Sequence, residues 1–219
     1  HSLVVMKQPQ HPQELPYDLV NNFRHYDFNR SLLWIQYYGK LQYGSNFEIF
    51  PQDKETLYKL LIYTIRDEEN CKKYNLDLNK GLMLTGPIGC GKTSLMNIMR
   101  KFAYMETMYN IVSTRDIAAA YNQEGFPIIH NYGKSSKIYC FDDLGVERSM
   151  KHFGNDCNTM AEILLSRYDF MTQLGTITHA TTNLNAKELE DAYGNRVRSR
   201  LRSMFNLISF PQSSIDKRK

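Results

Sequence analysis

The chain has 219 residues, of which 42% are hydrophobic and 23% are charged, with a formal net charge of +4. This length and apolar content are enough for one substantial domain with an appendage, which argues against a disordered chain. Because no run of about 18 apolar residues occurs, we expect no membrane span. No signal peptide is expected at the N-terminal end. The four cysteines form no C-x-x-C pair, which disfavours a zinc site or a disulfide framework and favours a cytoplasmic location.

Positive charge is concentrated at the C-terminal end. Residues 196–219 contain seven lysines or arginines and a single acid, Asp216. A localised basic segment is a better indicator of an anionic partner than overall charge is. For residues 217–219, a solvated basic tail that binds no partner is an equally good interpretation.

The first 80 residues precede the main sheet in the predicted order of elements. Residues 7–16 contain three prolines and predict an extended lead-in. Residues 17–43 are rich in aromatic side chains and predict one or two helices, which either pack on the main domain or face a partner. Residues 52–70 have apolar side chains at helical spacing and predict one helix, followed by a polar connector over residues 71–80.

Strands and helices alternate through the rest of the chain. Strands are predicted over residues 81–85, 111–114, 137–145, 175–183 and 205–210. Helices are predicted from 94 to about 105, over 116–122, around 160–171, over 186–193 and around 196–204, and residues 128–136 are predicted to be a polar linker. This alternation predicts an α/β fold, a five-stranded parallel sheet with helices on both faces.

Residues 86–93, with the sequence GPIGCGKT, match the phosphate-binding loop pattern G-x-x-x-x-G-K-[ST]. They lie between an apolar strand and the start of a helix, where backbone N–H groups converge on a phosphate. Lys92 would reach the β- and γ-phosphates, and the Thr93 hydroxyl would bind magnesium. The alternative, a glycine-rich turn with a chance lysine, does not account for this context. The sequence therefore predicts that a nucleoside triphosphate binds through Gly86, Pro87, Ile88, Gly89, Cys90, Gly91, Lys92, Thr93 and Ser94.

Two further predicted strands end in polar residues that could face the triphosphate, since ligands of such folds bind at the carboxyl ends of the strands. Asp142 suits the magnesium shell, through water, and Asp143 suits the base that polarises the attacking water. Asn183 could orient that water or contact the γ-phosphate. The alternatives are a solvated acidic turn for the two aspartates and a turn or helix start for Asn183.

Four arginines occur at every second position: Arg196, Arg198, Arg200 and Arg202. This spacing cannot place all four on one face of a helix, so we expect them to have separate roles. An arginine donated to the γ-phosphate of a neighbouring subunit can accelerate hydrolysis by roughly 10³–10⁵. A basic surface helix is the alternative.

The order of the segments GPIGCGKTS, IYCFDDLGVE, ATTNL and GNRVRSRL resembles the AAA+ ATPases of the DnaC-type helicase-loader and IstB-type transposition-helper family, over about residues 50–210. The resemblance implies an ATPase that uses ATP and Mg²⁺. It makes Lys92 and Thr93 the Walker A residues and Asp142 and Asp143 the Walker B pair. Asn183 matches the first sensor.

The resemblance also assigns Arg200 to the arginine finger that reaches an adjacent subunit. Arg196 matches a further family arginine with no assigned role. Glu147 and Arg167 match further family positions, for which the subunit interface is one location. Only nine residues follow Phe210, too few for the helical lid of other AAA+ proteins, and the helicase loaders are similarly lidless. We therefore expect a partner-binding or packing segment over 1–50, an AAA+ core over 51–211 and a basic tail over 212–219.

The resemblance implies that copies of the chain assemble with one another and with DNA, in single-stranded form, and load or remodel a replicative helicase. A transposition helper that delivers a transposase is the main alternative, and a small-molecule P-loop kinase is a minor one. Candidate DNA-phosphate contacts are Arg115, Lys134, Lys137 and residues 217–219.

Overall fold

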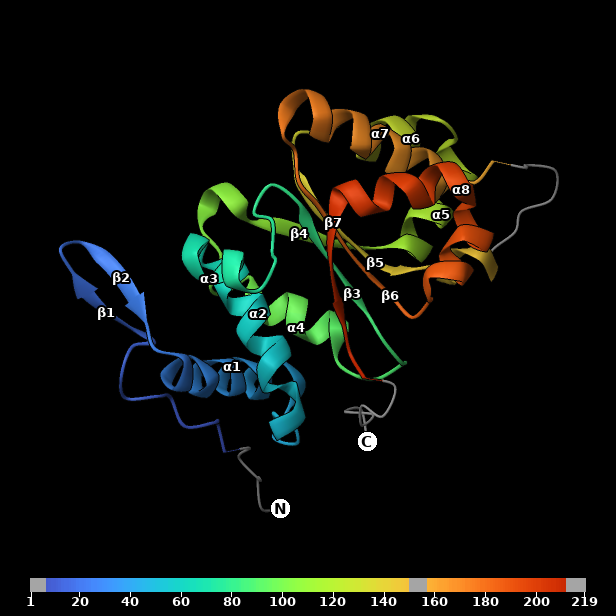
Figure 1. Cartoon of the computed structure of the whole chain (residues 1–219). Helices are drawn as coiled ribbons and strands as arrows, with labels where there is room; N and C mark the ends of the chain where they lie inside the picture. Colours follow the sequence, from blue (N-terminus) through green and yellow to red (C-terminus); the bar gives the residue numbers. More distant parts are fainter. Residues whose placement is uncertain (1–6, 150–156, 212–219) are drawn as a thin grey trace, which may run out of the picture.

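The computed structural model describes residues 7–149 and 157–211, and its centre is a five-stranded sheet (Figure 1). The strands are β3 (Gly81–Thr85), β4 (Tyr109–Ser113), β5 (Ile138–Leu144), β6 (Thr178–Thr182) and β7 (Phe205–Ser209). They lie in the order β4-β5-β6-β3-β7, and every neighbouring pair is parallel. The predicted α/β fold with a five-stranded parallel sheet is confirmed.

Helices cover both faces of this sheet (Figure 1). One face carries α1 (Phe28–Tyr43), α2 (Lys54–Thr64), α3 (Glu68–Lys73) and α4 (Lys92–Met99). The other face carries α5 (Thr114–Glu124), α6 (Pro127–Gly133), α7 (Thr159–Leu174) and α8 (Ala186–Met204). Short 3-10 helices occur at Pro51–Asp53, Met105–Thr107 and Val146–Ser149.

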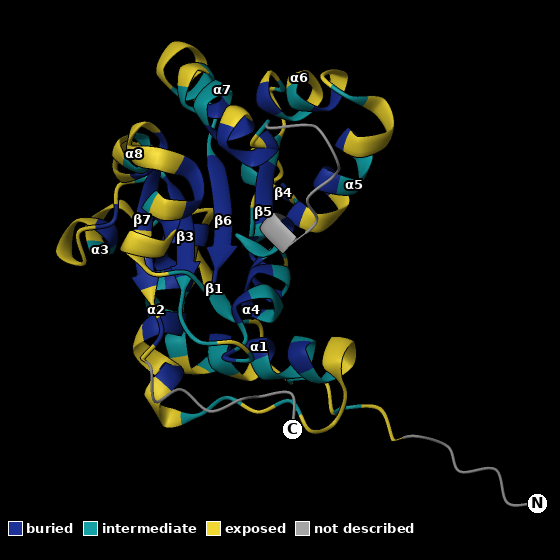
Figure 2. Cartoon of the chain, turned by 90° about the vertical axis from the view of Figure 1, so that its right-hand side faces the viewer, coloured by how far each residue is buried: buried dark blue, intermediate teal, exposed yellow. Residues whose placement is uncertain are grey.

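Two hydrophobic cores result, one on each face, and β3 shows how a single strand serves both. Leu82 and Leu84 belong to the core under α1, α2 and α4, whereas Met83 belongs to the core under α5 to α8. Successive strand residues point to opposite faces, and a strand covered on both faces is apolar throughout. Figure 2 accordingly shows buried strands and exposed residues along the outer sides of the helices.

The N-terminal segment differs from the prediction of helices over residues 17–43. β1 (Tyr17–Val20) and β2 (Phe23–Tyr26) form an antiparallel hairpin that projects from the body (Figure 1). Its two-residue turn consists of Asn21 and Asn22, with φ of 50° and 64°. Asparagine tolerates this left-handed conformation, which a two-residue hairpin turn requires. α1 begins after Asp27, whose side chain accepts a hydrogen bond from Arg30 N, and then packs against α4.

Two other predictions need correction. The single helix expected over 52–70 is interrupted at Arg66, which has φ of 62°, and α3 restarts after its N-cap Asp67. The expected linker over 128–136 contains α6. This helix approaches α7 closely because Gly133 has no side chain: a Cβ there would lie 2.6 Å from Ser166 Cβ.

α8 consists of two helical segments joined at a kink, in agreement with the two helices predicted there. Gly194 has φ of 86° and ψ of 164°, a conformation nearly restricted to glycine. Within the described residues no helix follows β7. Among the same residues, none of the helices is long and apolar enough to cross a membrane.

Candidate nucleotide-binding site

The predicted phosphate loop connects β3 to the start of α4, so its backbone leads directly into the N-terminus of that helix. Gly89 and Gly91 have φ of 81° and 95°, which allows the tight turn that other residues would resist. A strand, a glycine turn and a helix start are thus arranged as a phosphate-binding loop requires.

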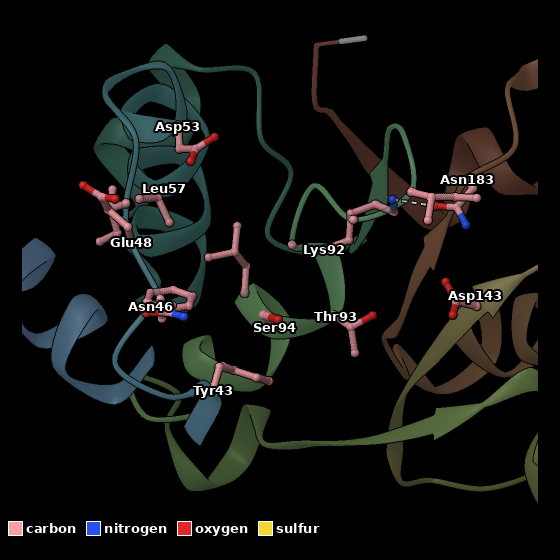
Figure 3. Close-up of a pocket in the computed structure, with 16 residues that line it drawn as sticks. Tyr43, Asn46, Glu48, Asp53, Leu57, Lys92, Thr93, Ser94, Asp143 and Asn183 are labelled. Carbon is pink, nitrogen blue, oxygen red and sulfur yellow. Dashed lines mark hydrogen bonds between the residues drawn. The ribbon is translucent and has the colours of Figure 1, made fainter. Parts of the chain in front are cut away.

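Lys92 joins this loop to the end of β6. Its Nζ donates hydrogen bonds to Gly86 O and Pro87 O, both at 2.9 Å, and to Asn183 Oδ1 at 2.6 Å (Figure 3). The lysine is 5% exposed. An ammonium group has three protons, so phosphate oxygens that bind Lys92 must replace one of these acceptors. The structure therefore brings together Lys92 and Asn183, two of the residues predicted for the site.

Asp142 and Thr93 form a second pair in the site. Asp142 Oδ1 accepts hydrogen bonds from Thr93 Oγ1 at 2.8 Å and from Thr181 Oγ1 at 2.6 Å. A carboxylate and a hydroxyl at this distance fit Mg²⁺, which prefers oxygen ligands and is usually completed by phosphate oxygens and water. Among the described residues, no group of three or more His, Cys, Asp and Glu side chains forms another metal site.

Asp143 lies at an irregularity of β5, where the register with β6 shifts between Phe141 and Leu144. It has φ of 58°, and its N–H donates to Thr181 Oγ1 at 2.9 Å. Thr181 thus contacts both aspartates and fixes their relative position. Sequence reasoning chose Asn183 from the segment Thr181-Thr182-Asn183 and assigned Thr181 no role. Its place on a strand beside the Asp142 strand was the available signal.

The site opens into a cavity of about 470 Å³ that extends from the phosphate loop to the N-terminal segment (Figure 3). The phosphate-loop end is lined by Ile88, Gly89, Gly91, Lys92, Thr93, Ser94 and Leu95, together with Asp143 and Asn183. The other end is lined by Tyr43, Asn46, Phe47, Glu48, Ile49, Asp53 and Leu57. The predictions from sequence did not include this second group, because it belongs to no motif.

α1 contributes directly to the wall at this other end of the cavity. A Cβ on Gly39 would lie 2.1 Å from Phe47 Cε1, so the glycine provides the space in which the Phe47 ring packs on α1. The Phe47 ring also stacks on Tyr43, with centroids 6.1 Å apart. The pKa of the Tyr43 phenol is raised by burial, although the side chains of Asn97 and Ser94 on α4 oppose this shift. The wall is therefore fixed to both α1 and α4.

The four arginines lie apart from this cavity, whose described lining includes none of them. The Arg200 guanidinium stacks 4.5 Å above the centroid of the Tyr168 ring. Arg198 pairs with Glu190 across the kink, and Arg196 and Arg202 are exposed. The four arginines therefore occupy three different environments, and their separate roles stay a prediction.

Arg167 is completely buried, so the expectation of a subunit-interface location is wrong for this residue. Its guanidinium donates to the carbonyls of Ser135, Lys137 and Ile177 at 2.7 to 3.0 Å and to Thr178 Oγ1 at 2.8 Å. Burial lowers its pKa to about 10. Arg167 therefore holds together the segments that lead into β5 and β6.

The remaining predicted residues lie at the surface or outside the described part. Arg115, Lys134 and Lys137, proposed as DNA-phosphate contacts, are exposed. Residues 217–219 lie outside the described residues. Glu147 is 9% exposed and is held by contacts within the subunit.

Comparison with solved structures identifies the architecture. A DnaC helicase loader aligns with a TM-score of 0.54 and 18% identity, over 76% of this chain and 95% of that one. The chain has the AAA+ fold. DnaI aligns with a TM-score of 0.54 and 20% identity, over 76% and 89% of the two chains. AMPPCP-bound DnaA from Aquifex aeolicus aligns with a TM-score of 0.52 and 16% identity, over 75% of this chain and 48% of that one. No family model and no curated protein sequence matches the chain.

Proposed function

We propose that this AAA+ protein binds ATP with Mg²⁺ and hydrolyses it to ADP and phosphate. The observation that carries the proposal is the convergence of Lys92 with Asn183 and of Thr93 with Asp142, at 2.6 and 2.8 Å, at one end of a cavity. A phosphate loop alone would support binding. The aspartate pair and Asn183 add the groups that hydrolysis needs.

Each residue then has a distinct task. Lys92 binds the β- and γ-phosphate oxygens, Thr93 binds Mg²⁺ directly, and Asp142 does so through water. Asp143 accepts a proton from the attacking water, which Asn183 orients. Bound Mg²⁺ would neutralise charge that develops on the phosphate oxygens. Thr181 keeps the two aspartates in register through its hydrogen bonds to both residues.

We further propose that ATP binds between subunits and that Arg200 acts on the site of a neighbouring copy. Arg200 rests on Tyr168, away from the cavity of its own subunit, so its own subunit gives it no task at the phosphates. ATP binding then favours assembly of the subunits, and ATP hydrolysis releases the assembly.

The partner that best fits the comparisons is a replicative helicase, with single-stranded DNA as a second ligand. Two of the reported structural neighbours are DnaC, named as a helicase loader, and DnaI, and the third is DnaA. The proposed division is a partner-binding or packing segment over residues 1–50, the ATPase core over 51–211 and the basic tail over 212–219. A transposase remains the alternative partner, since the same core would serve it.

The first test measures ATP turnover and light scattering with and without single-stranded DNA. Lys92→Ala should abolish turnover, and Arg200→Ala should lower it by roughly 10³ or more without loss of nucleotide binding. Arg202→Ala, which removes a neighbouring exposed arginine, is the matched control. If Arg200→Ala assembles and hydrolyses ATP at the wild-type rate, the action of Arg200 on a neighbouring site is wrong.

The partner is tested separately. Co-purification with a replicative helicase supports helicase loading, and co-purification with a transposase supports the alternative. ATP turnover stimulated by small phosphate acceptors and not by DNA would instead indicate a kinase.

A further inference from the structure

Glu147 joins the loop that follows the two aspartates to the first segment of α8. Its Oε2 accepts a hydrogen bond from Gly145 N at 2.8 Å, and its Oε1 accepts one from the Tyr193 hydroxyl. Glu147 and Tyr193 are only 9% and 6% exposed. A buried carboxylate that accepts from two donors fixes both of them, because loss of either donor leaves a charge poorly solvated.

The position of Tyr193 gives this contact its significance. The next residue is Gly194, where α8 changes direction, and the segment beyond it carries Arg196 and Arg200. The helix is also anchored just before the kink, where Asn158 Nδ2 donates to Ala192 O at 2.7 Å. The direction of the arginine segment is therefore set at a glycine whose preceding residue is tied to Glu147.

The far side of the kink is braced in a different way. Arg198 pairs with Glu190, so this charge pair spans the kink. Val197 and Leu201 are buried in the core under α8. These contacts hold the second segment as a rigid unit, and a change at Tyr193 is therefore carried to Arg200, seven residues further along the chain.

We infer that Glu147 and Tyr193 are positioning residues that link the end of β5, where Asp142 and Asp143 lie, to the arginine segment offered to the neighbouring subunit. Their hydrogen bond thus connects the subunit's own nucleotide site to the arginine segment that the same subunit donates to its neighbour's site. This inference rests on the proposed function, because it requires that Arg200 acts on a neighbour. It assigns to Glu147 a task within its own subunit, in contrast to the interface location that the sequence suggested.

The test uses Tyr193→Phe, which removes the hydroxyl and keeps the ring. We expect kcat for ATP to fall about tenfold, the effect of losing one hydrogen bond to a charged group, with nucleotide affinity close to wild type and some loss of thermal stability. Tyr63→Phe is the matched control. It removes another largely buried hydroxyl, which donates to Lys80 O at 2.6 Å on the opposite face of the sheet, and should leave kcat unchanged. Glu147→Gln provides a second variant, and the double variant should be no slower than the slower single one.

Mixed oligomers separate positioning of the donated arginine from an effect on the subunit's own site. Lys92→Ala subunits cannot hydrolyse ATP but offer a normal arginine segment. If Tyr193 positions that segment, mixing Tyr193→Phe with Lys92→Ala subunits restores turnover above the sum of the two, as it should for Arg200→Ala mixed with Lys92→Ala.

Each other outcome overturns the inference. If Tyr193→Phe has wild-type kcat, the hydrogen bond has no positioning role. If its kcat falls and mixing restores nothing while the Arg200→Ala mixture recovers, Tyr193 acts on its own subunit's site. If the Arg200→Ala mixture also fails to recover, the action of Arg200 on a neighbouring site is wrong, and the inference built on it falls for that separate reason.

Discussion

His179 should make the stability of this protein depend on pH below neutrality. The side chain is 3% exposed on β6, and its Nδ1 accepts a hydrogen bond from Leu82 N at 2.9 Å. The rings of Tyr63 and Tyr109 lie against it, with centroids 5.9 and 4.8 Å away. Burial, followed by the positive charges of Arg66 and Arg167, lowers its pKa from 6.5 to about 3. A protonated Nδ1 would also lose the ability to accept from Leu82.

The size of the effect follows from the two pKa values. The folded state keeps His179 neutral down to about pH 3, whereas the unfolded chain begins to bind a proton near its ordinary pKa of 6.5. Between these values the unfolded state holds more protons, so the free energy of unfolding decreases as the pH falls. From pH 7.5 to pH 5.0 this contribution amounts to about 2 kcal/mol.

Urea unfolding at a series of pH values measures this contribution. His179→Asn is the comparison, because its Oδ1 takes approximately the place of Nδ1 and cannot be protonated in this range. The variant should be less stable at pH 7.5, since it removes buried ring atoms, but it should lose about 2 kcal/mol less than the wild type on going to pH 5.0. Equal losses in the two proteins would refute the neutral, buried state of His179.

Three substitutions test other parts of the structure. Asp142→Asn should lower kcat for ATP by about two orders of magnitude, because it removes the charge offered to Mg²⁺. Phosphate release measures the loss of turnover, and binding of a fluorescent ATP analogue shows that nucleotide still binds. Wild-type turnover would contradict the role of Asp142 at Mg²⁺. Gly39→Ala should cost about 1–3 kcal/mol in urea unfolding because the Phe47 ring must move, and Phe47→Leu in the same chain should recover part of this loss. Gly194→Ala should cost about 1–3 kcal/mol through its backbone conformation, whereas Asn195→Ala beside it should have little effect; similar stabilities would contradict the kink.

The sheet and the phosphate loop could be predicted because their signals are local. β3 is a run of five residues with apolar side chains at its centre, followed directly by the glycine turn, and both patterns depend only on neighbouring positions. Asp142 and Asn183 were found in the same way, each at the end of a strand. Their convergence follows from parallel strands, whose carboxyl ends meet at one edge of the sheet.

The contacts that complete the site depend on distant parts of the chain, and no local pattern marks them. Phe47 follows a break after an aromatic segment, and only the fold brings it to Gly39 and to the cavity. The hairpin at residues 17–26 was mistaken for helix because aromatic side chains suit both structures, and its two asparagines decide the turn. Arg167 lies in no sequence pattern that marks it as a buried residue, since its partners are the Thr178 hydroxyl and carbonyl groups of distant segments.

The wall formed by Tyr43 and Phe47 bears on how the protein can be divided. The proposed ATPase core, expressed from residue 51, would include the phosphate loop and both aspartates but would leave one end of the cavity open to solvent. Replacing the N-terminal segment with that of another protein would therefore also change the lining of the cavity. Any force on the hairpin that moves α1 would also reach Tyr43, at the C-terminal end of the same helix.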